Sequence, residues 1–488
     1  MYAQLARLGY KIGIGFGIFG ALARWIFGQQ IAAIIGLTWK AAFRFRLFIV
    51  VAALLLAAVV GLPILIKDDG TARGFTQILL TYTLSAITGL LGISTLWLAC
   101  GTLARDIEDC QMQVVAVKPI PRWRIWLGKW LGIMSLNAAL LAISGFSVYA
   151  LLQWRATKLP VEEQQTLRNE ILVARGSIKP KNVEADIRDE AEGRLKQRLT
   201  KTPVGAADLP EVRKQIREQV KAEYEQVPPG YTRTWELDLG LAKDKVRNRP
   251  LQMRVKFQSA DKSASGTFEA MWQFGVPRKT RIARSQPMSL SPETFHEFEI
   301  PENLYDENGI LTVSFLNANN TTLIFPVDEG IEVLYPQGSF GPNFARGLGV
   351  IFCWMALLGA LGLFAASFLS FPVAAFFAVG LLAVVFSTKT IESAVTEGTL
   401  GHFNAETGQA GRLPIDVVAI PVFKGILQVI QLAKGFSPVD SLSTGRSITW
   451  SELAQAFGEI VLILGGPFAL MGMGILTRRE LATAQGTQ

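Results

Sequence analysis

Six uncharged apolar stretches, separated by polar sequence, limit how this chain can fold. A helix needs roughly 20 apolar residues to cross about 30 Å of hydrocarbon, because each residue advances it by about 1.5 Å. The stretches lie at residues 47–66, 78–103, 130–154, 348–371, 373–387 and 460–477, and the fifth is the shortest. The sequence therefore predicts six transmembrane helices in a polytopic membrane protein.

Composition and charge agree with this class. Half of the 488 residues are hydrophobic, and 18% are charged, which is below the usual quarter. The net charge of +8 comes from basic residues that flank the stretches and do not gather with aromatic residues, so membrane topology is favoured over nucleic-acid binding. The flanks of the first and last stretches carry Lys40, Arg44, Arg46, Arg478 and Arg479. They predict cytosolic termini and an outward-facing insert between the third and fourth spans.

The N-terminal segment, residues 1–46, contains a second kind of helical pattern. Residues 29–46 alternate apolar and basic positions at helical spacing, and they are too short and too charged to span a membrane. This pattern is typical of an interfacial elbow helix lying in the membrane plane. The alternative is a basic flank of the first span.

The insert, residues 155–346, divides into two parts. Residues 155–227 are rich in Glu, Lys and Arg with apolar residues at helical intervals, which predicts amphipathic helices. Residues 231–340 alternate apolar and polar positions between turn residues such as Asn308-Gly309, which predicts short antiparallel strands in a small β-sandwich. The predicted fold class is therefore an α-helical polytopic membrane protein with an extracytoplasmic α+β insert.

A polar segment at residues 104–124 joins the second and third spans (47–154 hold the first three). Its charged helical residues, its basic turn and the glycines that follow are, in order, Arg105, Asp106, Glu108 and Asp109; Lys118, Pro119 and Arg122; and Gly128, Lys129 and Gly132. A rigid helix held between two spans can transmit movement if it projects from the bilayer and docks on a partner. The alternative is an ordinary charged cytosolic loop.

This ordered set resembles the cytosolic coupling segment of type-2 ABC exporter permeases. In that family a Ser-Arg-Glu-Ile-Glu-Asp-like helix precedes a Lys-Pro turn and a Gly-Lys-x-x-Gly entry into the next span. The chain differs at Gln111, Met112 and Gln113, where many relatives carry Thr-Leu-Glu. The resemblance covers residues 29–154 and 347–482, including the basic Arg-Arg-Glu end of the last span.

The resemblance implies a permease subunit of an ATP-driven exporter in a bacterial inner membrane. It implies an elbow, a coupling helix, a second identical or related permease subunit, contacts with membrane lipids, and an ABC ATP-binding subunit. The implied coupling residues are Arg105, Asp106, Glu108, Asp109 and Gln113. It also implies that residues 388–455 of the C-terminal part, 347–488, form outward re-entrant helices. A seventh span there would place the C-terminus outside.

The substrate is unknown, and the uncharged spans suit amphipathic or lipid-like cargo. The alternative is a mechanotransmitting subunit whose outer domain acts on an envelope partner without transport.

The chain itself lacks the residues for chemistry. It has no Gly-x4-Gly-Lys-Ser/Thr loop, so ATP and Mg²⁺ would be bound by the partner subunit. The spans contain no ionisable residue, which disfavours an ion-coupled carrier. His296 and His402 stand alone in sequence, so we predict no catalytic, cofactor or metal residues and disfavour a membrane-bound enzyme.

Gly465, Gly466 and Pro467 interrupt the middle of the last span. Proline removes one helical hydrogen bond, so a kink is expected. The kink predicts either a gating hinge or close packing against a neighbouring helix.

Overall fold

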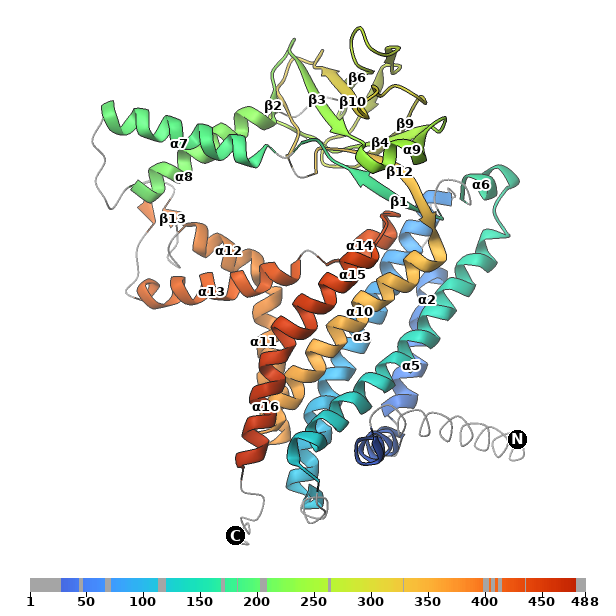
Figure 1. Ribbon diagram of the computed structural model, residues 1–488, viewed down its shortest axis with the longest axis vertical. Coiled ribbons are helices and arrows are strands. Elements are labelled where there is room, and N and C mark those ends of the chain that lie inside the picture. Colours follow the sequence, from blue (N-terminus) through green and yellow to red (C-terminus); the bar gives the residue numbers. More distant parts are fainter. Residues whose placement is uncertain are drawn as a thin grey trace. The chain divides into compact units, whose positions relative to one another are not determined.

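The computed structural model describes residues 28–43, 47–65, 72–112, 120–167, 172–181, 183–201, 209–261, 265–327, 329–397, 403–404, 409–410, 415–434 and 436–479. The chain forms two compact units, whose elements are labelled in Figure 1. The membrane unit comprises Met1–Leu172 and Phe340–Gln488, and the insert unit comprises Val173–Ser339.

Four helices in the described part of the chain are long and apolar enough to cross a membrane. They are Gly74–Glu108, Arg122–Ala156, Phe340–Ala366 and Trp450–Arg478. The helices Gly28–Phe43 and Phe48–Pro63 make a fifth candidate only as a pair bent by 67°. The structure thus confirms a multi-pass helical membrane protein, with four or five candidate spans where six were predicted.

The first and fifth predicted spans account for the difference. Helix α2 (Leu47–Leu65) contains Pro63 and counts toward a span only together with the bent helix before it. Helix α11 (Phe371–Phe386) has 16 residues, so it is about 24 Å long, shorter than a hydrocarbon core of about 30 Å. The helix Gly28–Phe43 occupies the predicted elbow, and its location at a membrane surface remains a prediction.

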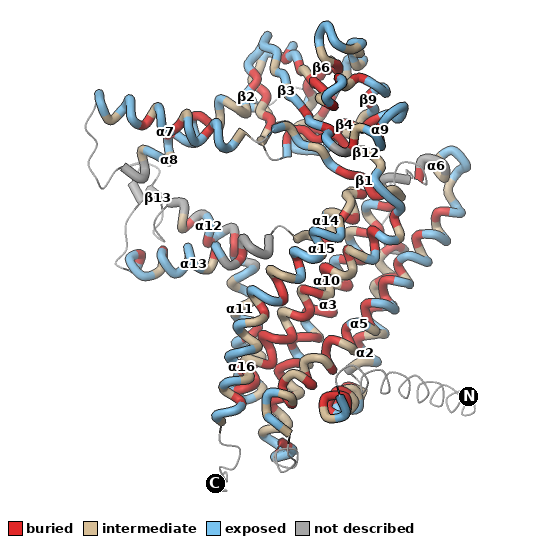
Figure 2. Tube along the Cα trace, in the orientation of Figure 1, coloured by how far each residue is buried: buried red, intermediate tan, exposed pale blue. Residues whose placement is uncertain are grey.

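Three long helices, α3 (Ala72–Glu108), α5 (Arg122–Ala156) and α10 (Phe340–Ala366), carry much of the buried surface of the membrane unit (Figure 2). Glycines allow these helices to approach closely. A Cβ added at Gly362 of α10 would lie 2.6 Å from the Cβ of Ala99 and 3.2 Å from the carbonyl oxygen of Leu96. Small residues at helix contacts are typical of packing within membranes.

The segment before the last span folds into short elements. It contains α12 (Thr388–Glu397), the paired strands β13 (Phe403–Asn404) and β14 (Gln409–Ala410), α13 (Asp416–Lys434) and α14 (Pro438–Ser443). None of these is among the four long candidate spans in the described part of the chain. Their outward location and re-entrant character remain predictions.

The insert unit begins with a helical pair and continues as antiparallel sheet. Helix α7 (Glu184–Lys201) packs on α8 (Leu209–Glu225) through Ile187, Ala191 and Leu195. The strands form three sheets. The four-stranded sheet has the order β1 (Val173–Ile178), β12 (Ile331–Ser339), β4 (Leu251–Val255), β9 (His296–Ile300). The five-stranded sheet has the order β3 (Thr232–Asp238), β10 (Ile310–Leu316), β6 (Phe268–Phe274), β7 (Ala283–Arg284), with β8 (Met288–Leu290) also paired to β6. The small sheet has the order β2 (Gln226–Val227), β11 (Leu323–Ile324), β5 (Gln258–Ser259).

One apolar core joins these sheets, with Phe257, Trp272, Phe274 and Phe315 almost fully buried. The structure confirms the predicted helical and antiparallel parts of the insert. A two-layer sandwich remains a prediction.

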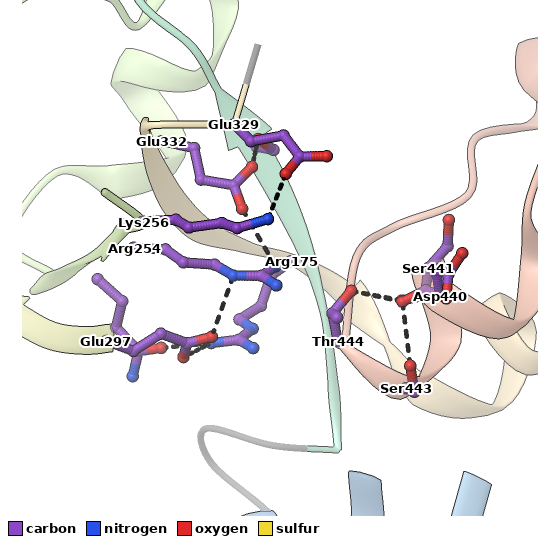
Figure 3. A network of polar contacts seen from close by, with 12 residues as sticks. Arg175, Arg254, Lys256, Glu297, Glu329, Glu332, Asp440, Ser441, Ser443 and Thr444 are labelled. Carbon is purple, nitrogen blue, oxygen red and sulfur yellow. Dashed lines mark hydrogen bonds and ion pairs between the residues drawn. The ribbon is translucent and has the colours of Figure 1, made fainter. Parts of the chain in front are cut away.

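A row of charged side chains crosses the four-stranded sheet (Figure 3). Glu332 of β12 lies opposite Arg254 of β4, which lies opposite Glu297 of β9. Arg254 Nη1 is 3.1 Å from Glu332 Oε1, and Arg175 of β1 donates to Glu297 Oε2 at 2.9 Å. A one-residue shift between strands would leave buried charges without their partners, so the row favours this strand register.

The predicted Asn308-Gly309 turn is present and is held by Asp306. The Asp306 carboxylate accepts hydrogen bonds from the amides of Asn308 (3.0 Å) and Ile310 (2.9 Å), and Gly309 has φ +81°. These amide bonds, principally that of Ile310, together with Lys279, lower the pKa of Asp306 below its usual range.

Replacing Asp306 with asparagine should lower the melting temperature of the protein, and the effect should depend on pH. The folded-state pKa lies below the unfolded value of about 3.9. The stabilisation is therefore fully present above about pH 4 and is lost as the pH falls through the folded pKa. Melting temperatures of wild type and Asp306→Asn between pH 6 and 3 should converge at the acid end. Glu307→Gln, at an exposed position in the same loop, is the control. A pH-independent gap for Asp306→Asn would contradict this account.

Candidate functional site

The predicted coupling residues lie at the end of α3. Arg105, Asp106 and Glu108 belong to its last two turns, and Cys110 beyond them takes a left-handed conformation with φ 57°. A separate coupling helix was therefore the wrong prediction for these residues. No glycine or proline occurs between residues 102 and 108, so nothing stops the span from continuing.

Lys129 of α5 pairs with Asp106 of α3. Its Nζ donates to Asp106 Oδ2 at 2.5 Å and to the carbonyl oxygen of Thr102 at 2.8 Å. The side chain of Lys129 is only 8% exposed, whereas that of Asp106 is 34% exposed. An ammonium group this buried requires such acceptors. The pair therefore joins the two helices on either side of the predicted coupling segment.

Glu108 and Arg105 contact the start of α11. The amide of Phe371, the first residue of α11, donates to Glu108 Oε1 at 2.8 Å. A carboxylate at this position satisfies an otherwise unpaired helical amide and interacts favourably with the helix dipole. The guanidinium carbon of Arg105 lies 4.4 Å from the centre of the Phe371 ring, a cation–π contact.

Arg122, at the start of α5, caps the end of the last helix. Its Nη1 donates to the carbonyl oxygens of Leu476 (3.1 Å), Thr477 (3.0 Å) and Arg479 (2.6 Å). These carbonyls have no partner within the helix, so a cation there stabilises the helix end. Arg479 in turn donates to the carbonyl oxygen of Ser367, just after α10.

Two glycines of α5 seat the helix Gly28–Phe43. A Cβ at Gly128 would lie 2.9 Å from Ile34 Cβ, and one at Gly132 would lie 2.7 Å from Thr38 Cβ. Trp39 Nε1 donates to Ser135 Oγ at 2.7 Å and fixes the same contact. The predicted Gly-Lys-x-x-Gly entry thus combines two packing glycines with the buried Lys129.

A short exposed turn remains beyond these contacts. Asp109, Cys110 and Gln111 are exposed, whereas Met112 is buried. The amide of Asp109 continues the helical bonding by donating to the carbonyl oxygen of Arg105 at 2.8 Å. Gln113 lies outside the described residues.

The predicted hinge lies where the last helix changes its hydrogen-bonding pattern. The helix consists of α15 (Trp450–Ala456), a π-helical stretch at Phe457–Gly465, and α16 (Gly466–Arg478). Pro467 has no amide hydrogen, and the change from π to α occurs immediately before it. Hinge motion here remains a prediction.

The described residues offer no site for metal chemistry. Among them, no three His, Cys, Asp or Glu side chains are grouped to hold a metal ion. His296 Nε2 lies 2.8 Å from the carbonyl oxygen of Ser291 and 2.9 Å from Thr294 Oγ1, so it belongs to a local turn.

Sequence reasoning found the position of this site but not its contacts. Lys129 and Arg122 were recognised as motif residues without a role, although their spacing from a helix start hinted at one. Nothing in the sequence indicated that Glu108 would meet Phe371, 263 positions away. Comparisons with protein-family models, curated proteins and solved structures gave no match for this chain.

Proposed function

We propose that this chain is the permease subunit of an ATP-driven exporter of the type-2 ABC class. A separate ATP-hydrolysing subunit would dock at the turn that follows α3. The observation that carries the proposal is the contrast within residues 105–111. Asp106 and Glu108 are fixed to other helices, whereas Asp109 and Gln111 are exposed beside them.

These contacts provide a route for movement. A displacement of the exposed turn would act on α5 through Asp106 and Lys129, and on α11 through Glu108. Arg122 would carry it from α5 to the end of α16. Charge-assisted hydrogen bonds are among the stronger polar contacts in proteins, so helix ends joined by them tend to move together.

The proposal includes a second permease subunit and a path for amphipathic or lipid-like cargo across a bacterial inner membrane. In the last candidate span only 22% of the apolar window is buried, compared with 61% in Phe340–Ala366. Exposed side chains such as Leu462, Ile463 and Leu470 are therefore available for another permease subunit or for lipid. ATP and Mg²⁺ would be bound by the partner subunit.

The variant Asp109→Lys with Gln111→Lys should lose its ATPase partner. Two cations in place of an anion and a neutral group would oppose an interface that accepts the native turn. ATP hydrolysis that co-purifies with the protein in mild detergent should fall by about tenfold or more. The amount of bound ATP-binding polypeptide should fall in parallel.

The matched control is Glu162→Lys with Gln153→Lys, which has the same change in charge at exposed positions near the other end of α5. Its co-purifying ATPase activity should equal that of wild type. Retention of the activity by the Asp109/Gln111 variant, or equal loss in both variants, would contradict docking at the turn.

A second candidate function, mechanotransmission to an envelope partner, is favoured by one observation. Strand β12 ends at Ser339 and helix α10 begins at Phe340, with no loop residue between them. Strand β12 is also paired with β1 from Val173↔Ser339 onward. A shift of α10 would thus act directly on the sheet of the insert. Substrate flux in reconstituted vesicles that persists after the insert is altered favours transport, and loss of function without any measurable flux favours mechanotransmission.

A further inference from the structure

Three loops of the insert unit lie together around residues 301–309. The first loop, residues 239–250, contains the short helices η2 (Gly240–Ala242) and α9 (Lys243–Val246). The second loop, residues 275–284, follows β6 and runs into β7. The third loop, residues 301–309, connects β9 to β10. We call these three loops the basic platform.

Polar contacts bind the first and second loops to the third. Asn248 and Asn303 form a reciprocal pair, in which the Asn248 amide donates to Asn303 Oδ1 (3.1 Å) and Asn303 Nδ2 donates to Asn248 Oδ1 (2.8 Å). Thr280 Oγ1 donates to the carbonyl oxygen of Leu304 at 3.2 Å, and Lys279 Nζ lies 3.4 Å from Asp306 Oδ2. The loops are therefore mutually braced.

The platform also concentrates unusual backbone conformations. Three of its residues other than glycine have positive φ: Asn248 (54°), Arg278 (66°) and Asn303 (60°). Asparagine tolerates this region, but for arginine it is unfavourable. Such conformations persist only where the surrounding structure holds them, and they are enriched at functional sites. The conformation at Arg278 accompanies an exposed charged side chain.

The charge of the platform is strongly one-sided. Its eight basic residues are Lys243, Lys245, Arg247, Arg249, Arg278, Lys279, Arg281 and Arg284, and its four acidic residues are Asp244, Glu302, Asp306 and Glu307. Seven of the basic side chains are exposed, whereas Asp306 is buried and bonded to backbone amides. This differs from the buried row of Arg175, Arg254, Glu297 and Glu332, where opposite charges balance.

We propose that the basic platform binds phosphate groups displayed in multiple copies on an anionic polymer or membrane surface. Five of the eight cations are arginines, whose planar fork fits phosphate in a bidentate manner. The loops lack an apolar anchor of the kind that dominates protein interfaces, because their large exposed apolar side chain is Ile282. Their aromatic residue, Tyr305, is partly buried in the core and gives no stacking surface for bases.

The test uses the full chain in nanodiscs of neutral phosphatidylcholine. The probes are long-chain polyphosphate and, separately, vesicles containing phosphatidylglycerol. Wild type should bind at least one of them at 0.1 M salt. The variant Arg249→Gln/Arg278→Gly/Arg281→Gln should bind it about tenfold more weakly or less. Glycine is chosen at position 278 because it accepts the positive φ.

The matched control is Lys196→Gln/Arg213→Gln/Arg217→Gln, which removes three exposed cations from α7 and α8. It should bind like wild type, and the melting temperatures of all three proteins should agree. Vesicle binding alone would identify a lipid source of phosphate, and polyphosphate binding would identify a soluble polymer. The proposal is overturned if wild type binds neither probe, if the control loses as much affinity as the platform variant, or if polyglutamate binds as tightly as polyphosphate.

Discussion

Replacement of Gly362 by valine should prevent the membrane unit from packing normally. Even the first carbon of the new side chain would lie 2.6 Å from Ala99 Cβ and 3.2 Å from the carbonyl oxygen of Leu96. Both belong to α3, so no flexible side chain can move aside, and α10 must separate from α3. Overpacking of this kind costs about 3 kcal/mol. The purified variant should melt well below wild type in detergent and elute as aggregate in gel filtration.

Gly380→Val in α11 is the control, because a Cβ there has nothing within 4 Å. Valine is also the better helix former by a few tenths of a kcal/mol, so its melting temperature should equal that of wild type or rise slightly. Normal behaviour of Gly362→Val would mean that α3 and α10 do not approach as closely as described.

Removal of Asp106 should be more harmful than removal of its partner Lys129. Asp106→Ala leaves the buried ammonium of Lys129 with only the carbonyl oxygen of Thr102, whereas Lys129→Met leaves a carboxylate that is one-third exposed and can be hydrated. We expect a loss of about 3 kcal/mol for Asp106→Ala and about 1 kcal/mol for Lys129→Met. Denaturation of the purified variants in detergent measures both.

The double variant Asp106→Ala/Lys129→Met should be more stable than Asp106→Ala alone, because no buried charge remains unpaired. Asp109→Ala, three residues further along at an exposed position, is the control and should be neutral. Additive losses in the double variant would show that the two charges do not interact.

The apolar periodicity predicted the helices whose cores are longest. Stretches 78–103, 130–154 and 460–477 lie within candidate spans of the structure. The stretch 373–387 was equally apolar, but hydropathy does not report helix ends, and Ser370 before α11 together with the turn at Ser387 limits that helix to 16 residues. The bend before α2 likewise depends on packing between helices and not on composition.

The candidate site shows a similar division. Charge pattern and spacing drew attention to residues 105–109, because polar residues between two spans are easily seen in sequence. Their partners were not visible, since Phe371 and Leu476 are hundreds of positions away and contribute only backbone groups. Residues that appeared suited to docking, Asp106 and Glu108, instead hold the membrane unit together. In the insert, period-two alternation identified the strands, while the loops of the basic platform come together only through sheet topology.

Site-specific photocrosslinking from the turn after α3 tests the account most directly. A photoreactive amino acid at position 109 or 111, activated in intact cells, should form a covalent adduct with a polypeptide that carries a Gly-x4-Gly-Lys-Ser/Thr loop. The same probe at position 153 should give no such adduct. Adducts with that polypeptide only from position 153, or none from either end, would contradict docking of an ATPase at this turn.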